Sequence, residues 1–275
     1  MTVTGTYYQQ RRSYSVNLCS SVAKHPITVS LVVSLANVTA VIFDYYETLA
    51  ELSFAMRERL FDDLARRVGR ALPAGEGFRH WRERITSDMT LRLGGERAPL
   101  NGPKPPFRTF GDVWLERMRQ LFQHWDVETP AELGADAYAH MHENADVYPD
   151  VPPALEALRG RYRLAVLSDA DTGFLEASLR RNDLAFEAVV ASDEMRAYKP
   201  HVSLFREVCG RLHVPPEQAV YVGDSPWADI EGARRAGMRA VWINRHDATW
   251  PDDIAPPAST VTSLGELGAL LEAPA

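Results

Sequence analysis

Acidic, hydroxyl and lysine side chains follow short apolar runs at several points of this chain. Asp44, Ser168 and Asp224 each stand at or directly after the end of such a run, and Lys199 lies in the loop after another. An aspartate can attack phosphorus or carbon and form a covalent ester, which divides a difficult hydrolysis into two easier steps. These residue types therefore suit a hydrolase that works through a covalent intermediate.

Each of these residues also has an ordinary structural explanation. Asp44 would cap the turn after its strand, Ser168 would bond to backbone, and Lys199 would be a solvated loop charge. Ser225 and Pro226 are typical of a helix start, as N-cap and first helical residue. Their joint order on successive strand ends is what favours the chemical interpretation.

The residues after Pro149 alternate between strand and helix patterns. Apolar β-branched runs predict strands, and amphipathic stretches predict helices between them. Such alternation indicates an α/β fold, a doubly wound parallel sheet with helices on both faces. In this fold ligands bind beyond the carboxyl ends of the strands, where the polar residues above are expected. The predicted strands are 38–43, 163–168, 188–192, 219–223 and 239–244, and the predicted helices are 152–159, 172–181, 201–211 and 226–236.

A long segment between the first two strands has a different pattern. Its apolar residues recur at helical spacing with charges between them, which predicts amphipathic helices. A stretch rich in glycine and proline, residues 94–106, interrupts the pattern and is predicted to be a loop. We therefore expect a helical insertion in the sheet domain, with helices at 54–68, 76–93, 109–125 and 130–143.

The start of the chain fits neither pattern, and we expect residues 1–37 to be a disordered extension. The apolar run 27–36 is similar to the hydrophobic part of a signal peptide, so export is an alternative to the cytoplasmic location that we expect. The run that ends at Phe43 contains several polar residues and is too short for a membrane span.

The composition excludes some classes of partner. The 275 residues carry a formal net charge of -7 at pH 7. This acidic balance argues against a protein that coats nucleic acid or an anionic membrane, so we expect neither as a partner. Cys19 and Cys209 match neither a metal-ligand spacing nor a disulfide framework. The sequence does not predict an oligomeric state.

Four short motifs stand at the ends of the predicted strands and in the loop after the third: F43-D-Y-Y-E-T-L49, L167-S-D-A-D171, Tyr198-Lys199-Pro200 and V222-G-D-S-P-W-A-D-I230. Their order resembles the haloacid dehalogenase-like (HAD) hydrolase superfamily. The resemblance covers residues 38 to about 270 and implies a Rossmann-like core of residues 38–52 and 147–275. It also implies that residues 53–146 are a helical cap, where substrate choice largely resides.

The resemblance implies a role for each residue at the strand ends. Asp44 would be the nucleophile, Lys199 would supply a positive charge, and Ser168 would donate its hydroxyl to a phosphate oxygen. Mg²⁺ suits such a site because it takes a few carboxylate or carbonyl oxygens and keeps positions for water and substrate. The implied substrate is a small anionic, phosphorylated metabolite. The ligands of Mg²⁺ would be Asp44, the backbone carbonyl of Tyr46, Asp224 and Asp229.

Tyr46 departs from the family pattern. Family phosphatases carry a second aspartate here, which protonates the leaving alcohol and later activates water. A phenol has a pKa of ~10, so Tyr46 could donate a proton but would hold it tightly. Losing a well-placed acid–base group costs about 10²–10⁴-fold in rate. Glu47 would be an alternative donor, and Tyr46 would otherwise be an aromatic wall of the pocket.

Three functions are compatible with this pattern. The first is a Mg²⁺-dependent phosphatase-type hydrolase, slowed by Tyr46. The second is a metal-independent haloalkanoate dehalogenase, since the family's dehalogenases carry D-x-Y. Against it, Asp224 with Asp229 is the metal-binding form of the fourth motif, and Asp169 replaces the asparagine that is usual in dehalogenases. The third is a catalytically degenerate binding or interaction module.

The predicted cap offers few recognisable substrate ligands. Phosphonate-cleaving relatives use a cap lysine, but Lys104, the one lysine of residues 53–146, lies in the Pro-rich loop and is predicted to be solvated. Arginine can bind a carboxylate or phosphate through two parallel hydrogen bonds. The cationic residues considered for this role are Arg79, His80, Arg82, Arg84, Arg92, Arg97 and Arg108.

Overall fold

The computed structural model describes residues 35, 37–83, 101–104 and 106–272. The predicted extension, residues 1–37, lies outside the described residues except for Leu35 and Asn37, so its disorder stays a prediction. In the described part of the chain, no helix is long and apolar enough to cross a membrane.

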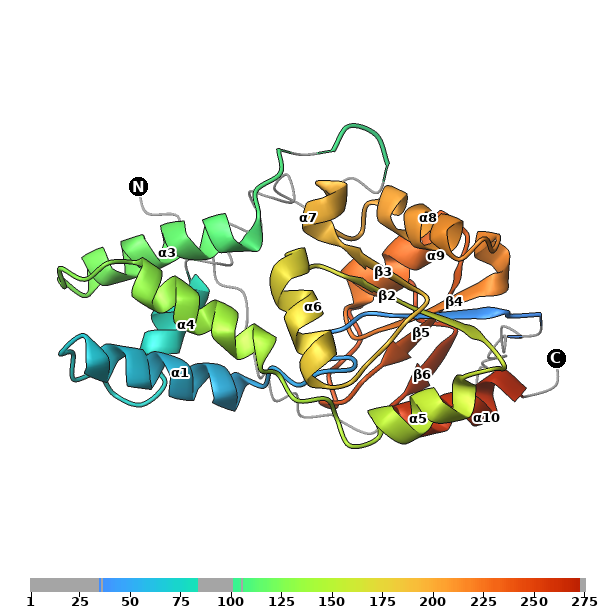
Figure 1. Ribbon diagram of the computed structural model, residues 1–275, viewed down its shortest axis with the longest axis horizontal. Coiled ribbons are helices and arrows are strands. Elements are labelled where there is room, and N and C mark those ends of the chain that lie inside the picture. Colours follow the sequence, from blue (N-terminus) through green and yellow to red (C-terminus); the bar gives the residue numbers. More distant parts are fainter. Residues whose placement is uncertain (1–34, 36, 84–100, 105, 273–275) are drawn as a thin grey trace, which may run out of the picture. The chain divides into compact units, whose positions relative to one another are not determined.

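Six strands among the described residues form one parallel sheet in the order β3-β2-β1-β4-β5-β6 (Figure 1). β1 lies in the middle, with Val41 opposite Leu164 of β2 and Val220 of β4. All of β1 is buried, as expected for an apolar strand that is covered on both faces. The bounds are β1 Ala40–Phe43, β2 Arg163–Ser168, β3 Ala188–Ala191, β4 Ala219–Gly223, β5 Arg239–Ile243 and β6 Ser259–Val261.

Helices cover both faces of this sheet, which confirms the predicted doubly wound α/β fold. Val41 and Phe43 of β1 belong to the core with α5, α6 and α10, whereas Ala40 and Ile42 belong to the core with α8 and α9. This alternation is the period of two that a strand requires. The bounds are α5 Val151–Leu158, α6 Thr172–Arg181, α8 Val202–Arg211, α9 Gly232–Ala236 and α10 Leu267–Glu272.

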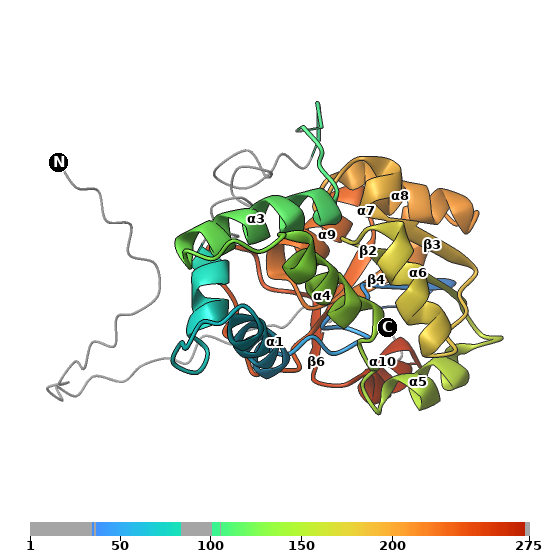
Figure 2. The same ribbon diagram turned by 60° about the vertical axis from the view of Figure 1, so that its left-hand side comes forward.

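The segment between β1 and α5, which we call the insertion, is helical as predicted. Helices α1, α3 and α4 lie next to one another in both views (Figures 1 and 2). Residues 76–83 are also helical, and the rest of the helix predicted for 76–93 lies outside the described residues. The bounds are α1 Phe54–Arg67, α3 Phe110–His124 and α4 Glu132–Glu143.

Aromatic rings fill the interior of the insertion. Tyr138 of α4 lies 5.7 Å from Phe61 of α1, 5.1 Å from Trp81 and 4.9 Å from Trp114 of α3, measured between ring centroids. Aromatic side chains bury large areas and gain further energy from tilted and edge-to-face contacts. These contacts therefore hold the helices of the insertion together.

The two segments that connect the insertion to the sheet, around residues 50–51 and 146–147, pair with each other, and we call them the linkers. Ala50 forms an antiparallel bridge with Val147, and the N–H of Glu51 donates to the carbonyl of Asp146 at 2.9 Å. The linkers thus meet close to the predicted domain boundaries at residues 53 and 146. The division of the chain into a core and a cap domain at these residues stays a prediction.

Some elements differ from the sequence-based expectation. β6 and α10 were not predicted, because both are short and lie near the C-terminus without a strong period. The predicted helix 226–236 is a π-helical turn, Pro226–Glu231, followed by α9. The third strand ends at Ala191, because Ser192 begins a short helix, α7 Ser192–Met195.

Candidate active site

The predicted aspartates and lysine meet at the carboxyl ends of the strands. Lys199 Nζ lies 2.8 Å from Asp44 Oδ1 and 2.6 Å from Asp229 Oδ1. Carboxylate oxygens of Asp44, Asp224 and Asp229 lie within 4.8 Å of one another. Asp44, Lys199 and Asp229 are buried, and Asp224 is partly buried. The structure therefore brings four of the predicted site residues into one cluster.

The turn after β4 is shaped to position Asp229. Ser225 Oγ accepts a hydrogen bond from Ala228 N at 3.2 Å, and Pro226 is the first helical residue, so both predictions for this turn are confirmed. Asp229 Oδ2 accepts a hydrogen bond from Ser225 N at 2.8 Å. A Cβ atom on Gly223 would lie 2.4 Å from Asp229 Cγ, so glycine is required where β4 ends.

Lys199 is fixed by groups from two further strands. Its Nζ donates to Tyr221 OH at 3.2 Å, and Tyr221 OH donates to the carbonyl of Leu167 at 2.7 Å. Burial alone would lower the pKa of Lys199, but the carboxylates of Asp229 and Asp44 outweigh it and raise that pKa well above its usual value. The ammonium group is therefore a permanent charge. The sequence analysis missed Tyr221, whose only signal is a phenol inside the apolar run of β4.

The loop after β2 brings a second predicted region to the same place. Ser168 ends β2 and is buried. Asp169 Oδ1 accepts a hydrogen bond from the backbone N–H of Lys199 at 2.9 Å. Burial raises the pKa of Asp169 to about 7, although Lys199 opposes this shift. Asp169 thus holds the Lys199 loop, a role that the sequence analysis did not foresee.

The negative charge of the cluster exceeds its positive charge. Burial raises the pKa of Asp224 well above its usual value, and Asp229 and Asp44 raise it further. Burial also raises the pKa of Asp229, although Lys199 lowers it. Three carboxylates therefore face one lysine. This donor set fits a divalent cation that prefers oxygen ligands, because such a cation would relieve the repulsion between the carboxylates.

The phenol of Tyr46 is engaged with the insertion. Its OH donates to the carbonyl of His142 in α4 at 3.3 Å, and the two rings meet edge-on with centroids 5.1 Å apart. Burial raises the pKa of Tyr46 above its usual value, and the neighbouring Tyr45 and Asp44 raise it further. The phenol is therefore a poor proton source. This geometry agrees with the alternative in which Tyr46 is an aromatic wall.

Glu47, the alternative proton donor, is bound in the linker region. Its Oε1 lies 3.4 Å from Arg57 of α1, and its Oε2 lies 3.1 Å from Tyr148 OH and 3.0 Å from His246 Nε2. These contacts give Glu47 a structural role between the linkers and the insertion. The sequence could not group its partners, because Arg57, Tyr148 and His246 come from three distant segments.

Four of the cationic residues considered as substrate ligands lie in the part of the chain that the structure describes, and each has a partner within the insertion. The exposed Lys104 has a partner outside the insertion: its Nζ donates to the carbonyl of Met195 at 2.7 Å. Arg84, Arg92 and Arg97 lie outside the described residues. The recorded partners are Glu76 for Arg79, Trp125 for His80, the ring of Phe54 for Arg82 and the carbonyl of Asp112 for Arg108.

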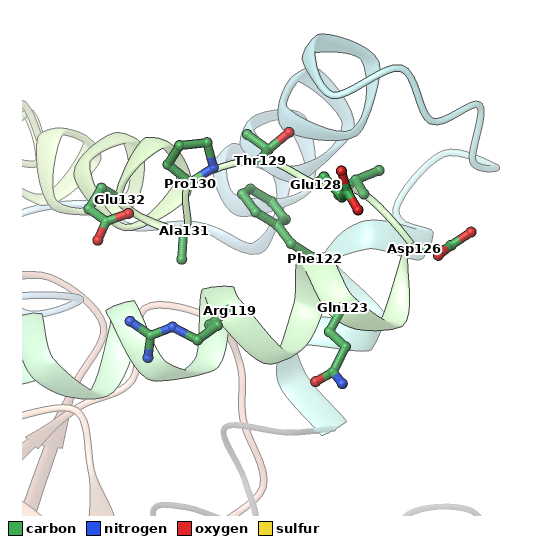
Figure 3. A pocket seen from close by; sticks show the side chains of 10 residues that line it. Arg119, Phe122, Gln123, Asp126, Glu128, Thr129, Pro130, Ala131 and Glu132 are labelled. Carbon is green, nitrogen blue, oxygen red and sulfur yellow. The ribbon is translucent and has the colours of Figure 1, made fainter.

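A surface pocket of about 620 Å³ lies elsewhere, where α3 turns into α4 (Figure 3). Arg119, Phe122, Gln123 and Glu132 are among the residues that line it. None of the predicted site residues borders this pocket. The carboxylate cluster, rather than this pocket, therefore defines the candidate active site.

Known proteins are similar to this chain over most of its length. Residues 38–237 match the model of the haloacid dehalogenase-like hydrolase family. The chain is 31% identical over 238 residues to (S)-2-haloacid dehalogenase 4A of Burkholderia cepacia, with 84% of this chain and 94% of that protein covered. It is 34% identical over 243 residues to N-acylneuraminate-9-phosphatase of Rattus norvegicus, with 86% and 95% covered. The names of these two relatives state different reactions.

Solved structures share the fold. The HAD-hydrolase YfnB of Bacillus subtilis, solved with bound magnesium, matches with a TM-score of 0.69 at 20% identity, and the match covers 86% of this chain and 99% of that one. At this identity the likeness concerns the fold alone. The family match over residues 38–237 and the full-length relatives show that this chain belongs to the haloacid dehalogenase-like hydrolases.

Proposed function

We propose that this hydrolase is a Mg²⁺-dependent, phosphatase-type enzyme that acts on a small phosphorylated metabolite through a covalent intermediate on Asp44. The observation that carries the proposal is the cluster of Asp44, Asp224 and Asp229 around a single lysine. Burial raises the pKa of Asp224 and of Asp229, so three ionised carboxylates beside one ammonium group are unfavourable without a further cation. A divalent cation at this cluster would favour the ionised form of all three carboxylates.

The residues that would hold the cation are the three aspartates and the backbone carbonyl of Tyr46. Replacing the side chain at position 46 leaves that carbonyl in place, so Tyr46 does not remove a ligand. When bound, Mg²⁺ neutralises charge on the phosphate and allows an anionic nucleophile to approach it.

The residues of the chain supply the rest of the proposed reaction. A carboxylate oxygen of Asp44 attacks phosphorus, and the bond between phosphorus and the leaving oxygen breaks with its electron pair on that oxygen. Lys199 holds a positive charge beside Asp44, and the Ser168 hydroxyl donates to a phosphate oxygen. Water then attacks phosphorus and loses a proton to solvent, and phosphate leaves as its bond to Asp44 breaks and Asp44 returns to a carboxylate.

The leaving oxygen would take its proton from solvent, because the hydroxyl of Tyr46 already donates its hydrogen bond to the carbonyl of His142. Alcohols that are stable as anions should therefore leave faster than alkyl alcohols. We expect kcat to depend steeply on the pKa of the leaving alcohol, and natural turnover to be slow.

The test uses p-nitrophenyl phosphate, with Mg²⁺ or with chelator, on wild type and Asp44→Asn. We expect phosphate release that requires Mg²⁺ and is lost in Asp44→Asn. Release that is unaffected by chelator, or that persists in Asp44→Asn, would contradict the proposal.

A second candidate is hydrolysis of the carbon–halogen bond of a small haloalkanoate. The bond from Tyr46 to His142 favours it, since a halide leaves without a proton and the missing acid costs nothing. Asp44 would attack carbon, and the halide would leave with the bonding electrons. Water would then attack the carbonyl carbon of the Asp44 ester, and the bond to the alkyl oxygen would break. The hydroxyalkanoate would leave with one proton of the water, while the other goes to solvent and Asp44 returns to a carboxylate. Halide release from 2-chloropropionate that is unaffected by chelator would support this candidate over the first.

We also propose that residues 53–146 act as a cap domain over the site and that the enzyme is cytoplasmic. The paired linkers at Ala50 and Val147 support the first proposal, because the two chain connections of the insertion run side by side there. Limited proteolysis with and without phosphate tests the cap, and cell fractionation tests the location.

A further inference from the structure

Asp171 joins the loop after β2 to helix α3 of the insertion. Its Oδ1 accepts a hydrogen bond from Phe110 N at 2.8 Å, and its Oδ2 accepts one from Gly111 N at 2.7 Å. These are the first two residues of α3, whose N–H groups have no partner inside the helix. Thr109 Oγ1 accepts from the next N–H, that of Asp112, at 3.1 Å. One carboxylate of the sheet domain thus completes the cap of a helix in the insertion.

Asp171 also stands at the N-cap of its own helix, α6, yet its side chain makes no capping hydrogen bond there. An aspartate in this position ordinarily caps the helix that follows it. Here the carboxylate serves α3 instead, where the positive end of the helix dipole favours a negative charge. The first turn of α6 therefore lacks a side-chain capping hydrogen bond, and the carboxylate holds α3 against the sheet domain.

The same loop carries residues of the candidate active site. Ser168 ends β2, and Asp169 Oδ1 accepts a hydrogen bond from the backbone N–H of Lys199 at 2.9 Å. The carbonyl of Ala170 accepts from Ser192 Oγ of α7 at 3.0 Å. Successive residues of this loop therefore fix, in turn, the lysine loop, α7 and α3.

Helix α3 in turn places an aromatic ring against His142 and Phe174, two residues whose rings contact Tyr46. Trp114 of α3 stacks on Phe174 of α6 with centroids 5.0 Å apart and lies 4.6 Å from the ring of His142. The carbonyl of His142 is the acceptor for Tyr46 OH. The hydrogen bonds from α3 to Asp171 thus belong to a continuous chain of contacts that reaches Tyr46, in the loop that carries the nucleophile.

We propose that Asp171 is the positioning residue that seats α3, and with it the insertion, over the reaction centre during turnover. It acts through α3 and Trp114 rather than on the substrate. The kinetic part of this proposal rests on the proposed function, whereas the structural part does not depend on which bond the enzyme hydrolyses.

The kinetic test compares Asp171→Ala and Asp171→Asn with a matched control, Thr109→Val. The control removes a capping bond from the same helix but leaves the bonds to the sheet domain intact. We expect kcat/KM for p-nitrophenyl phosphate to fall by roughly 10- to 100-fold in Asp171→Ala, because small displacements of a closing element cost that much. Asp171→Asn keeps one acceptor oxygen and should lose less, and Thr109→Val should stay close to wild type.

Hydrogen exchange supplies a readout that needs no activity. We expect faster exchange in the peptide of α6, residues 172–181, in Asp171→Ala but not in Thr109→Val, because only the first change removes hydrogen bonds between α3 and the start of α6. Equal kinetics and equal α6 exchange in the two variants would overturn the proposal. A wild type that is inactive on the phosphate would contradict the proposed function, and the exchange comparison would still decide the role of Asp171. If Asp171→Ala does not fold, Asp171→Asn is compared in its place.

Discussion

On the sheet-domain side of the site, charged groups hold one another, with Lys199 Nζ 2.8 Å from Asp44 and 2.6 Å from Asp229. On the insertion side, the loop that follows β1 contacts aromatic rings. There the hydroxyl of Tyr46 donates a hydrogen bond of 3.3 Å to the backbone carbonyl of His142. Removing one partner of a buried ion pair is strongly destabilising. A packed apolar side chain, in contrast, can often be replaced by another of similar volume at a small cost in stability. This difference agrees with the proposal that the chemistry takes place beside the sheet and that the insertion acts as a cap.

The largest expected effect comes from breaking the charged side. Lys199→Met leaves three buried or partly buried carboxylates without their cation, so we expect the free energy of unfolding in chelator to fall by about 3–5 kcal/mol. Urea denaturation measures it. Lys104→Met is the matched control: its exposed Nζ bonds a single carbonyl, and a change within about 0.5 kcal/mol is expected. Similar losses in both variants would contradict the comparison.

Tyr46 lies where the two sides meet, and its replacement tests which side controls the rate. Tyr46→Asp restores an acid–base group, so phosphates with alkyl leaving groups should be hydrolysed up to about 10²-fold faster. Tyr46→Phe removes the hydroxyl that bonds His142, and its kcat should stay near that of wild type. Loss of turnover in Tyr46→Phe would show that the phenol itself takes part in the reaction.

The aromatic side predicts a pH effect through His142. Its Nδ1 lies 2.8 Å from the carbonyl of Tyr138, and burial lowers its pKa to about 3 from 6.5. Between these values the unfolded chain binds a proton that the folded chain does not. Stability should therefore decrease as the pH falls below 6.5, by up to about 1.4 kcal/mol per pH unit.

Thermal or urea unfolding between pH 7 and pH 5 measures this decrease. His142→Gln keeps a donor for the Tyr138 carbonyl but does not titrate, so its stability should decrease less over this range. Equal slopes for wild type and His142→Gln would show that another group governs the acid sensitivity.

The smallest effect is expected at Tyr221, which supports Lys199 without touching the carboxylates. Tyr221→Phe removes the bonds to Lys199 Nζ and to the Leu167 carbonyl, so a loss of about 1 kcal/mol in stability is expected. The KM for p-nitrophenyl phosphate should rise more than kcat falls, because the charge remains but its position loosens. An unchanged KM would indicate that the carboxylates alone fix Lys199.

The sequence was sufficient to predict most of the fold, because its apolar runs have the period and length of buried parallel strands. It failed where elements are short. β6 has three residues, S-T-V, and no run of that length carries a period. The turn Pro226–Glu231 was predicted as an α-helix because Ser225 and Pro226 look the same at the start of either kind of helix.

The site was predictable as far as it follows strand ends. Asp44, Asp224 and Lys199 follow apolar runs, and the structure brings them together. Asp171 and Tyr221 could not be assigned, because their partners are backbone groups and a lysine far away in the chain. Contacts between the insertion and the sheet domain depend on how the helices pack, which no local pattern records.

Whether Asp44 attacks phosphorus beside a divalent cation is tested most directly by a single turnover in H₂¹⁸O. One reaction contains p-nitrophenyl phosphate and Mg²⁺, and the other contains 2-chloropropionate. If Asp44 forms a phosphate ester, water attacks phosphorus, so ¹⁸O should appear in the released phosphate and not in the peptide that contains Asp44. Label in the Asp44 peptide after halide release, with no Mg²⁺-dependent phosphate release, would contradict the account.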